Sequence, residues 1–430
     1  MLHVFYLLDR RHHQSKWGLG AHQWAHVSTT DLIHWKTHPM ALTIEHEWEA
    51  SICTGSVFFD EGKYYAFYAT RMPDRSEHLG MAISNDGVRF DKLLPSTFDE
   101  PKAPYRHGPN RDPFVFGGKN DFHMTVTASL AAPEKPELAG ALEHLTSPDL
   151  KTWKVEPSPF LVTGYAADPE CSDLFFWHGW YYLLFSEGGQ AHYRMSRSRS
   201  GPWTKPAVDV FDGIEARVMK TAAFTGDRRT GVAFVPDGDF GGNLVFREIR
   251  QVPDGTLYTT FPGEMTPHGT VEPKPAIKSA RGHVDMTPGM ISLDATQAPA
   301  AAAIPVSENF LLKARLSPAD AAARFGFSFE DVTGAGALSI EFDPRGRRIQ
   351  WAGTPSPAGA LPFLDKVQDL AGPIEIELIA QGKTVDLNVN GRHTLIRRLP
   401  ATVGKTMLVF CNSGQLAVTR LTVESINTGK

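Results

Sequence analysis

Short apolar stretches rich in aromatic residues alternate with polar turns along the N-terminal part of the chain. Four of them share one layout: an apolar run, a turn containing Gly, and a second apolar run. They occupy residues 55–69, 111–128, 171–187 and 220–235. Apolar and aromatic runs bounded by such turn residues are typical of β-hairpins. The pattern therefore predicts four hairpins in repeated units.

A second repeated element is a polar turn that ends on an aromatic residue. It reads STTDLIHW (28–35), SNDGVRF (84–90), SPDLKTW (147–153) and SRSGPW (198–203). Repeats of about 50 to 60 residues with about four strands each have the size of β-propeller blades. Counting the unit that opens the chain, we expect an all-β fold with a five-bladed β-propeller. The terminal aromatic residues of the four turns are expected to pack between blades.

The composition and the hydrophobic pattern of the sequence change after the last hairpin. Residues 263–305 contain many Pro and Gly residues and the low-complexity run ATQAPAAAAIP, and they are expected to connect two domains. Strict alternation then returns, for example in residues 374–391. Alternation with period two is typical of strands that have one buried face. The expected organisation is a five-bladed β-propeller over residues 1–262, this linker region, and a C-terminal β-sandwich over residues 306–430.

Composition narrows the possible functions. The chain has 430 residues, which favours two domains, and a net charge of −5 with no long run of basic residues, which argues against nucleic acid as a partner. No run of 18 apolar residues occurs, so no membrane span is expected. Cys53, Cys171 and Cys411 lack the spacing of a disulfide framework or a zinc site, and no motif requires a metal or a cofactor. No signal peptide precedes the first apolar run, which favours the cytoplasm.

Two carboxylates stand at the openings of apolar strands. PNRDPFVF (109–116) places Arg111 and Asp112 there, and PECSDLFFW (169–177) repeats the arrangement with Glu170 in the place of Asp112. In a propeller, equivalent residues of different blades face one another across the axis. A pair of carboxyl groups suits hydrolysis of a glycosidic bond, because one protonates the leaving oxygen and the other attacks or activates water. The apolar strand should raise the pKa of Glu170, as a general acid requires, whereas Asp112 beside Arg111 should stay ionised. The alternative is that both are strand-end residues satisfied by local backbone groups.

Several separated motifs resemble those of glycoside hydrolase family 32. RDPFVF (111–116) is similar to the family's RDP motif and PECSDLF (169–175) to its EC motif. Residues 17–42 resemble its tryptophan-rich segment, CTGSVFF (53–59) its SGS-type strand, and GGNLVFREI (241–249) a late segment of the propeller.

The resemblance implies a retaining hydrolase of β-fructofuranosides of the sucrose, inulin or levan type, with a carbohydrate substrate and no metal or cofactor. It implies that Asp112 stabilises the transition state and that Glu170 is the acid/base. Arg111, Thr54 and Ser56 are then expected among the substrate-binding residues.

Tryptophan side chains are further candidates for binding sugar. Trp17, Trp24 and Trp48 stand in or near the tryptophan-rich segment, and sugar rings pack well on aromatic faces. Packing between blades is the alternative for the same residues.

One catalytic group of the family is missing from the sequence. The family's nucleophile is the Asp of an NDPNG-like motif on the first strand of blade one, and this chain contains no such motif. In the repeat, Met1 aligns with Lys63 and Trp180, which both open the second strand of a hairpin. Blade one is therefore expected to begin half-way, with the nucleophile about ten residues before Met1. Asp9 is the nearest substitute, but it stands at the far end of its strand.

Three functions of different classes follow from these observations. The leading one is a β-fructofuranosidase-like hydrolase whose native chain is longer. A propeller that binds carbohydrate without turnover is the second. Another five-bladed furanosidase of the arabinanase type, with a different spacing between its carboxylates, is the third. No motif indicates the oligomeric state.

Overall fold

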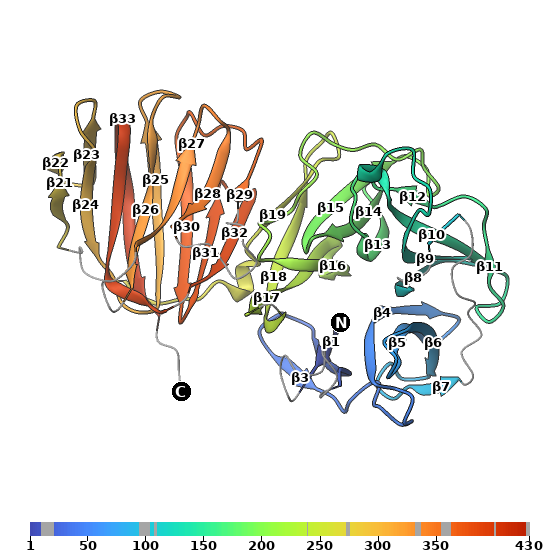
Figure 1. Ribbon diagram of the computed structural model, residues 1–430. Coiled ribbons are helices and arrows are strands. Elements are labelled where there is room, and N and C mark those ends of the chain that lie inside the picture. The colour runs from blue at the N-terminus through green and yellow to red at the C-terminus, as the bar shows by residue number, and fades with distance from the viewer. Residues whose placement is uncertain are drawn as a thin grey trace. The chain divides into compact units, whose positions relative to one another are not determined.

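The computed structural model describes residues 1–9, 21–93, 104–106, 110–238, 240–271, 276–331, 337–353, 363–399 and 401–426. Regular structure in these residues is almost entirely β-strand, as Figure 1 shows. The chain separates into two compact units. The first unit comprises Met1–Asp209 and Val218–Ala233, and the second comprises Val210–Arg217 and Phe234–Lys430. The sequence pattern placed the end of the first domain at residue 262, whereas the second unit already begins upstream of that residue.

The first unit consists of antiparallel sheets whose strands follow one another in sequence order. The first sheet contains β1 (Leu2–Leu8), β2 (Gln23–Thr29) and β3 (Trp35–Thr37). The second contains β4 (Ser51–Asp60), β5 (Lys63–Arg71), β6 (Glu77–Ser84) and β7 (Asp91–Leu93). The third contains β8 (Arg111–Gly118), β9 (Asp121–Ser129), β10 (Gly140–Ser147), β11 (Lys154–Val155) and β12 (Leu161–Val162). The fourth begins with β13 (Glu170–Trp177), β14 (Trp180–Glu187) and β15 (Gln190–Ser196), and β16 (Arg217–Phe224) and β17 (Arg228–Asp237) follow in its hydrogen-bonded order.

The sheets of the first unit surround a common centre. Figure 1 shows β1, β4, β8, β13 and β16 nearest that centre, with the later strands of each sheet farther out. Strands β4, β8 and β13 are each the first strand of a hairpin, whereas β1 pairs with β2 in the same way that β5 pairs with β6. In the first sheet β1 is the strand nearest the centre.

The repeated polar turn is a local hydrogen-bonded structure that recurs in three sheets. In each turn an Asp Oδ1 accepts the backbone N–H groups two and three residues later, and a left-handed residue follows the Asp. The Asp residues are Asp31, Asp86 and Asp149, and the left-handed residues are Leu32 (φ 62°), Gly87 (φ 71°) and Leu150 (φ 62°). An Asp at such a position stabilises the turn by replacing backbone partners. The turns are therefore encoded within a few residues.

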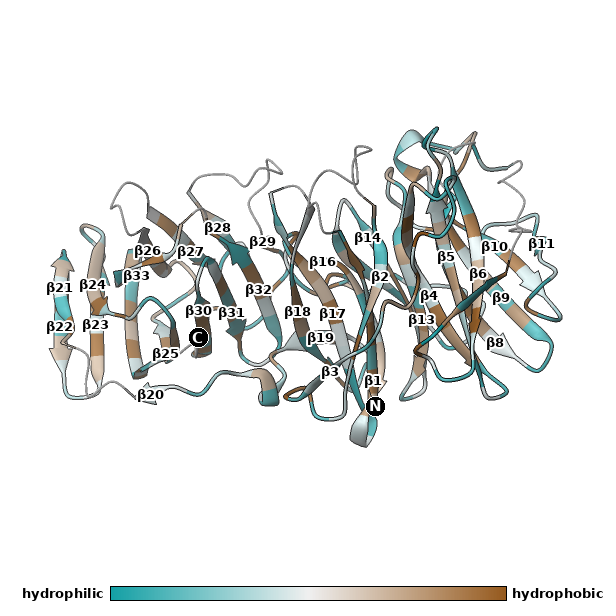
Figure 2. Ribbon diagram, turned by 90° about the horizontal axis from the view of Figure 1, so that it is seen from below, coloured by the Kyte–Doolittle hydropathy of each residue, from teal (hydrophilic) through white to brown (hydrophobic). Residues whose placement is uncertain are grey.

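Apolar cores lie between neighbouring sheets of the first unit. Phe90 belongs to the core between the first and second sheets, Trp153 packs on the core between the second and third, and Trp203 packs on the core between the third and fourth. The expectation that these aromatic residues pack between blades is confirmed for these three. In Figure 2 hydrophobic stretches lie along the strands, and hydrophilic residues gather in the turns.

The second unit contains two long strands, β18 and β33. β18 (Phe240–Gln251) pairs with β19 (Leu257–Thr260). β33 (Val403–Ser425) is the central strand of the large sheet and pairs with five other strands. Its first half contacts β24 and β26, and its second half contacts β23 and β25.

The remaining strands of the second unit enclose one apolar core. They are β20 (Thr270–Val271), β21 (Lys278–Arg281), β22 (His283–Thr287), β23 (Met290–Ala295), β24 (Ala300–Pro305), β25 (Phe310–Pro318), β26 (Arg324–Asp331), β27 (Ala337–Asp343), β28 (Arg348–Ala352), β29 (Phe363–Leu364), β30 (Ile374–Gln381), β31 (Thr384–Val389) and β32 (His393–Arg398). Ile374, Ile376 and Leu378 of β30 all face this core, so the alternation predicted for residues 374–391 is confirmed there.

The expected linker is the main difference between the sequence prediction and the fold. Residues 263–305 contain β20 to β24, so this stretch is largely part of the second unit's sheet. The alanine-rich β24 pairs with β33 on one side and with β21 on the other, and Ala300 and Ala302 are fully buried. Alanine has little intrinsic preference for strands, so pairing with distant strands decides the conformation here.

Candidate active site

The strands that carry the predicted carboxylates open in the same irregular way. Pairing of β8 with β9 shifts between Arg111 and Phe114, and pairing of β13 with β14 shifts between Glu170 and Asp173. In each bulge a non-glycine residue has a positive φ, 58° at Asp112 and 53° at Cys171. Such conformations are costly, and they concentrate at functional sites.

The bulges correct the alignment proposed from the sequence. Asp112 corresponds in position to Cys171, and Arg111 corresponds to Glu170. The prediction that Glu170 stands in the place of Asp112 is therefore wrong by one residue. The reason is that hydrogen-bond register and the position of the bulge set the equivalence, whereas the sequence comparison matched one acidic residue with another.

Arg111 is the centre of a cluster of carboxylates, which we call the Arg111 cluster. Its guanidinium donates a hydrogen bond from Nη2 to Glu170 Oε1 over 3.4 Å. Three further carboxylate oxygens lie 3.8 Å from its nitrogens, and they belong to Glu77, Asp112 and Asp168. The structure thus brings together the predicted residues Arg111, Asp112 and Glu170.

Glu77 and Asp168 were missed by the sequence analysis. Asp168 stands two residues before Glu170 and was visible as a third acidic residue near that motif. Glu77 opens β6, outside any motif, and only the fold places it beside Arg111. Two more arginines contact these acids: Arg71 donates to Glu77 over 2.8 Å and Arg106 to Asp168 over 3.3 Å.

Asp112 connects the two bulged strands. It is buried, and its Oδ2 accepts hydrogen bonds from the backbone N–H of Cys171 (3.1 Å) and from the hydroxyl of Thr127 (3.3 Å). Its Oδ1 has no hydrogen-bond partner in the described part of the chain. One oxygen of Asp112 therefore links β8 to β13.

Glu170 has the properties of a proton donor. About a third of its side chain is exposed, at 36%, so a ligand can reach it. Burial of the rest raises the pKa of Glu170, the charge of Asp112 raises it further, and Arg111 acts in the opposite direction. A carboxyl group with a raised pKa stays protonated closer to neutral pH, as a general acid must.

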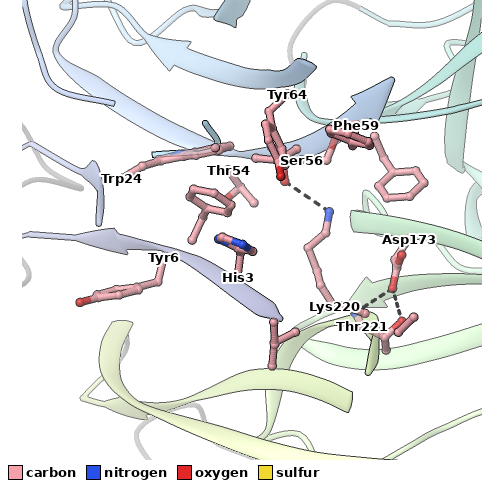
Figure 3. A pocket seen from close by; sticks show the side chains of 18 of the residues that line it. His3, Tyr6, Trp24, Thr54, Ser56, Phe59, Tyr64, Asp173, Lys220 and Thr221 are labelled. Carbon is pink, nitrogen blue, oxygen red and sulfur yellow. Dashed lines mark hydrogen bonds between the residues drawn. The ribbon is translucent and has the colours of Figure 1, made fainter. Parts of the chain in front are cut away.

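A cavity of about 520 Å³ is lined by residues of β1, β4 and β16. Figure 3 shows Trp24, Thr54 and Ser56 among the residues that surround it, together with Asp173 and Lys220. The cavity holds three of the residues predicted to bind substrate, but its lining does not include the Arg111 cluster.

The predicted aromatic platforms are placed as follows. Trp24 is buried in the core between the first two sheets, and its indole N–H donates to the Cys53 carbonyl over 2.8 Å. Trp48 stacks on the His46 ring, with centroids 5.3 Å apart and an interplanar angle of 6°. Trp17 lies outside the described residues. Asp9 directly follows β1 and is partly buried.

No group of three or more His, Cys, Asp or Glu side chains in the described residues is arranged to hold a metal ion. No helix among these residues is long and apolar enough to cross a membrane.

Comparison with known proteins relates the N-terminal part of the chain to one family. Residues 1–204 match the family model described as the glycosyl hydrolases family 32 N-terminal domain. The match covers 204 of the 430 residues, and this part of the chain is similar to glycoside hydrolase family 32. The resemblance proposed from the RDP-like and EC-like motifs is thereby confirmed, and both motifs lie inside the matched region.

Curated relatives in the family match only in part. The chain is 28% identical over 183 residues to fructan beta-fructosidase of Streptococcus mutans, which covers 40% of the chain and 11% of that protein. It is 27% identical over 188 residues to sucrose-6-phosphate hydrolase of Bacillus subtilis, covering 40% of the chain and 36% of that protein. For raffinose invertase of Escherichia coli the values are 25% over 229 residues, 49% and 45%. The aligned region spans less than half of each relative.

Solved structures of family 32 share the fold of the chain. A β-fructofuranosidase of Bombyx mori has a TM-score of 0.69 at 17% identity, covering 99% of this chain and 88% of that one. A fructan 1-exohydrolase of Cichorium intybus has a TM-score of 0.73 at 12% identity, covering 100% and 93%. At these identities the likeness concerns the fold alone. The predicted fold class, an all-β propeller followed by a β-sandwich, is confirmed.

Proposed function

We propose that the protein hydrolyses β-fructofuranosides, with Glu170 as the general acid/base and Asp112 as the carboxylate that holds sugar hydroxyls. The observation that carries the proposal is the pairing of a partly exposed Glu170, whose pKa is raised, with a buried Asp112 inside a family 32 domain. The names of the relatives support fructosides as the substrate class, since they include fructan, sucrose-6-phosphate and raffinose enzymes. The Bombyx mori enzyme has also been solved with sucrose bound.

The chemistry of the site follows from its two carboxyl groups. Glu170 gives its proton to the glycosidic oxygen as the bond between that oxygen and the fructosyl carbon breaks, and the departing sugar leaves as a neutral alcohol. The charge that develops on the fructosyl ring is stabilised by the nearby carboxylates. Glu170, now ionised, takes a proton from the water that completes hydrolysis.

The Arg111 guanidinium affects both the pKa and the orientation of the Glu170 carboxyl group. It faces four carboxylates, and its positive charge counteracts the repulsion from Asp112 and Asp168 that raises the pKa of Glu170. It also fixes the direction of the Glu170 carboxyl group through the 3.4 Å hydrogen bond. Retention additionally requires a carboxylate nucleophile, and the family's nucleophile motif does not occur in this sequence.

Release of fructose tests the proposal. The protein is expressed from its native gene with any in-frame codons upstream of Met1 included, so that a nucleophile encoded there is present. After purification it is incubated with sucrose, 1-kestose, inulin and levan, and free fructose is measured beside a matched reaction with 1,5-arabinan. We expect fructose from at least one fructoside and no release of arabinose. Glu170→Gln should abolish release from these substrates, because their leaving groups need a proton. Glu137→Gln, on an exposed turn, is the matched control and should leave the rate unchanged.

Three results would count against the proposal. Retention of fructosides on the protein without release of fructose would favour a carbohydrate-binding propeller. Release of arabinose would favour an arabinanase-type enzyme. Full turnover in Glu170→Gln would remove Glu170 as the acid. The anomeric form of the first product, followed by NMR, reports whether the reaction retains configuration and thus whether a carboxylate acts as nucleophile.

A further inference from the structure

The bulges that present Asp112 and Glu170 leave two backbone carbonyls outside the strand ladders. These are the carbonyls of Pro113 in β8 and Ser172 in β13, which lie within the shifts of register. A buried carbonyl without a partner is costly. Each is satisfied by a side chain from another sheet or strand: the Ser56 hydroxyl donates to Pro113 over 2.9 Å, and the Lys220 ammonium donates to Ser172 over 3.0 Å.

Of the two donors, Ser56 and Lys220, Lys220 is unusual because it contacts three inner strands. From β16 its ammonium reaches the Ser172 carbonyl of β13 and, over 3.4 Å, the Gly55 carbonyl of β4. It also lies over the ring of Phe114 in β8, 5.2 Å from the centroid. Figure 3 shows the Lys220 side chain extending across the cavity from β16.

The charge of Lys220 acts on backbone groups. Within the described ranges no carboxylate lies within 4.0 Å of its Nζ, although Asp173 lines the same cavity. Asp173 is instead held by the N–H and the hydroxyl of Thr221, over 2.8 and 2.5 Å. A hydrogen bond from an ammonium group to a carbonyl is stronger than one between neutral groups, and more so away from water.

We propose that Lys220 is a positioning residue for Glu170. Ser172 is two residues from Glu170, and the left-handed Cys171 stands between them. By holding the Ser172 carbonyl, Lys220 keeps Cys171 in its strained conformation, which directs Glu170 to Arg111 and the Cys171 N–H to Asp112. Without Lys220 the bulge relaxes, and both contacts of the Arg111 cluster with β13 weaken. The acid role of Glu170 in this inference rests on the proposed function, whereas the holding of the bulge does not.

Amide hydrogen exchange tests the holding of the bulge without any need for turnover. In Lys220→Met, which keeps the apolar arm but removes the donor, exchange of the Cys171 amide should become faster by on the order of tenfold or more. Lys220→Arg, which keeps a charged donor, should retain most of the protection. Ser56→Ala is the matched variant, since it removes the donor to Pro113 and should leave the Cys171 amide less affected. Lys154→Met, at an exposed lysine, controls for loss of charge.

A comparison of leaving groups tests the consequence for Glu170. Sucrose needs protonation of its leaving group, whereas a 4-nitrophenyl β-fructofuranoside does not. Lys220→Met should lower kcat for sucrose by on the order of tenfold, with KM little changed, and lower kcat for the nitrophenyl substrate much less. A variant that is merely less stable would lower both rates by the same factor.

The outcomes separate the two proposals. Protection of the Cys171 amide equal to that of the wild type in Lys220→Met overturns the positioning role, and so does an equal loss of kcat on both substrates. If the wild type hydrolyses neither substrate, the proposed function fails, and the exchange measurement alone decides the role of Lys220. If Lys220→Met does not fold, Lys220→Gln, which keeps a neutral donor, replaces it, with faster exchange than in Lys220→Arg as the supporting result.

Discussion

Glu143 is a buried acid that the proposed chemistry does not use. It lies in the middle of β10 opposite Val126 of β9, only 2% of its surface is exposed, and its Oε1 has no hydrogen-bond partner in the described part of the chain. Burial raises the pKa of Glu143 from 4.5 to about 7. The folded protein therefore holds this proton more tightly than the unfolded chain does.

The sign of the stability change follows from this difference. Below pH 4.5 Glu143 is protonated in both states, and its contribution to stability is fully present. As the pH rises from about 4.5 to about 7, the unfolded chain releases the proton first, and the free energy of unfolding falls. The rise of the Glu143 pKa from 4.5 to about 7 corresponds to roughly 3 kcal/mol of stability lost above pH 7, with a slope of at most about 1.4 kcal/mol per pH unit.

Glu143→Gln removes this titration while keeping the shape of the side chain. We expect the opening free energy of the variant to depend less on pH, so that the difference between variant and wild type grows by roughly 3 kcal/mol in favour of the variant between pH 4.5 and pH 8. The absolute offset contains a cost for burying the amide without a partner, which does not vary with pH.

Hydrogen exchange of peptides that cover β9 and β10 measures the opening free energy within the first unit. Exchange is followed from pH 4.5 to pH 8.5 and corrected for the intrinsic rate at each pH. Glu137→Gln, on an exposed turn, serves as the control with an unchanged profile. Parallel pH profiles for Glu143→Gln and the wild type would refute the reasoning, because they would show that Glu143 does not change its protonation on opening.

Three further predictions concern other parts of the chain. Burial lowers the pKa of His144 from 6.5 to about 4, so its contribution to stability is lost as the pH falls from about 6.5 to about 4. His144→Phe should remove up to roughly 3 kcal/mol of the loss of unfolding free energy on acidification and should lower the pH midpoint of acid unfolding. An unchanged midpoint would contradict this prediction. Arg247→Met should destabilise the second unit by roughly 3 to 5 kcal/mol in guanidinium titrations, because it leaves the buried Asp212 and the partly buried Asp386 without their shared arginine. Arg247→Met combined with Asp386→Asn should recover part of this loss, and a loss below about 1 kcal/mol in the single variant would disprove the role of this network. Asp149→Ala should lower the free energy of unfolding by about 1 kcal/mol, because two backbone N–H groups lose their acceptor. Asp149→Asn keeps an acceptor oxygen and should lower the free energy of unfolding less. Equal losses in the two variants would show that the charge of Asp149 matters and not its hydrogen bonds.

Prediction of the site from the sequence went as far as local motifs allow. Asp112 and Glu170 were found because each opens an apolar run, and Arg111 because it is adjacent to Asp112. Their mutual contacts depend on the two bulges. The register of the strands makes Arg111, and not Asp112, the residue equivalent to Glu170. Within a strand a shift of one residue turns a side chain to the other face, so a small error of alignment changes which residue meets which.

The sequence by itself determined the elements that are encoded within a few residues. The hairpins follow from apolar runs and turn residues, and the Asp-containing turns close their hydrogen bonds within three residues, so these were predictable together with the all-β class and the repeat. Only the tertiary structure decided what depends on distant partners: the strands within residues 263–305, the approach of Glu77 to Arg111, and the reach of Lys220 to Ser172. The physical reason is that strand pairing and side-chain contacts across sheets join residues far apart in the chain, and local preferences carry no information about which partner will be there.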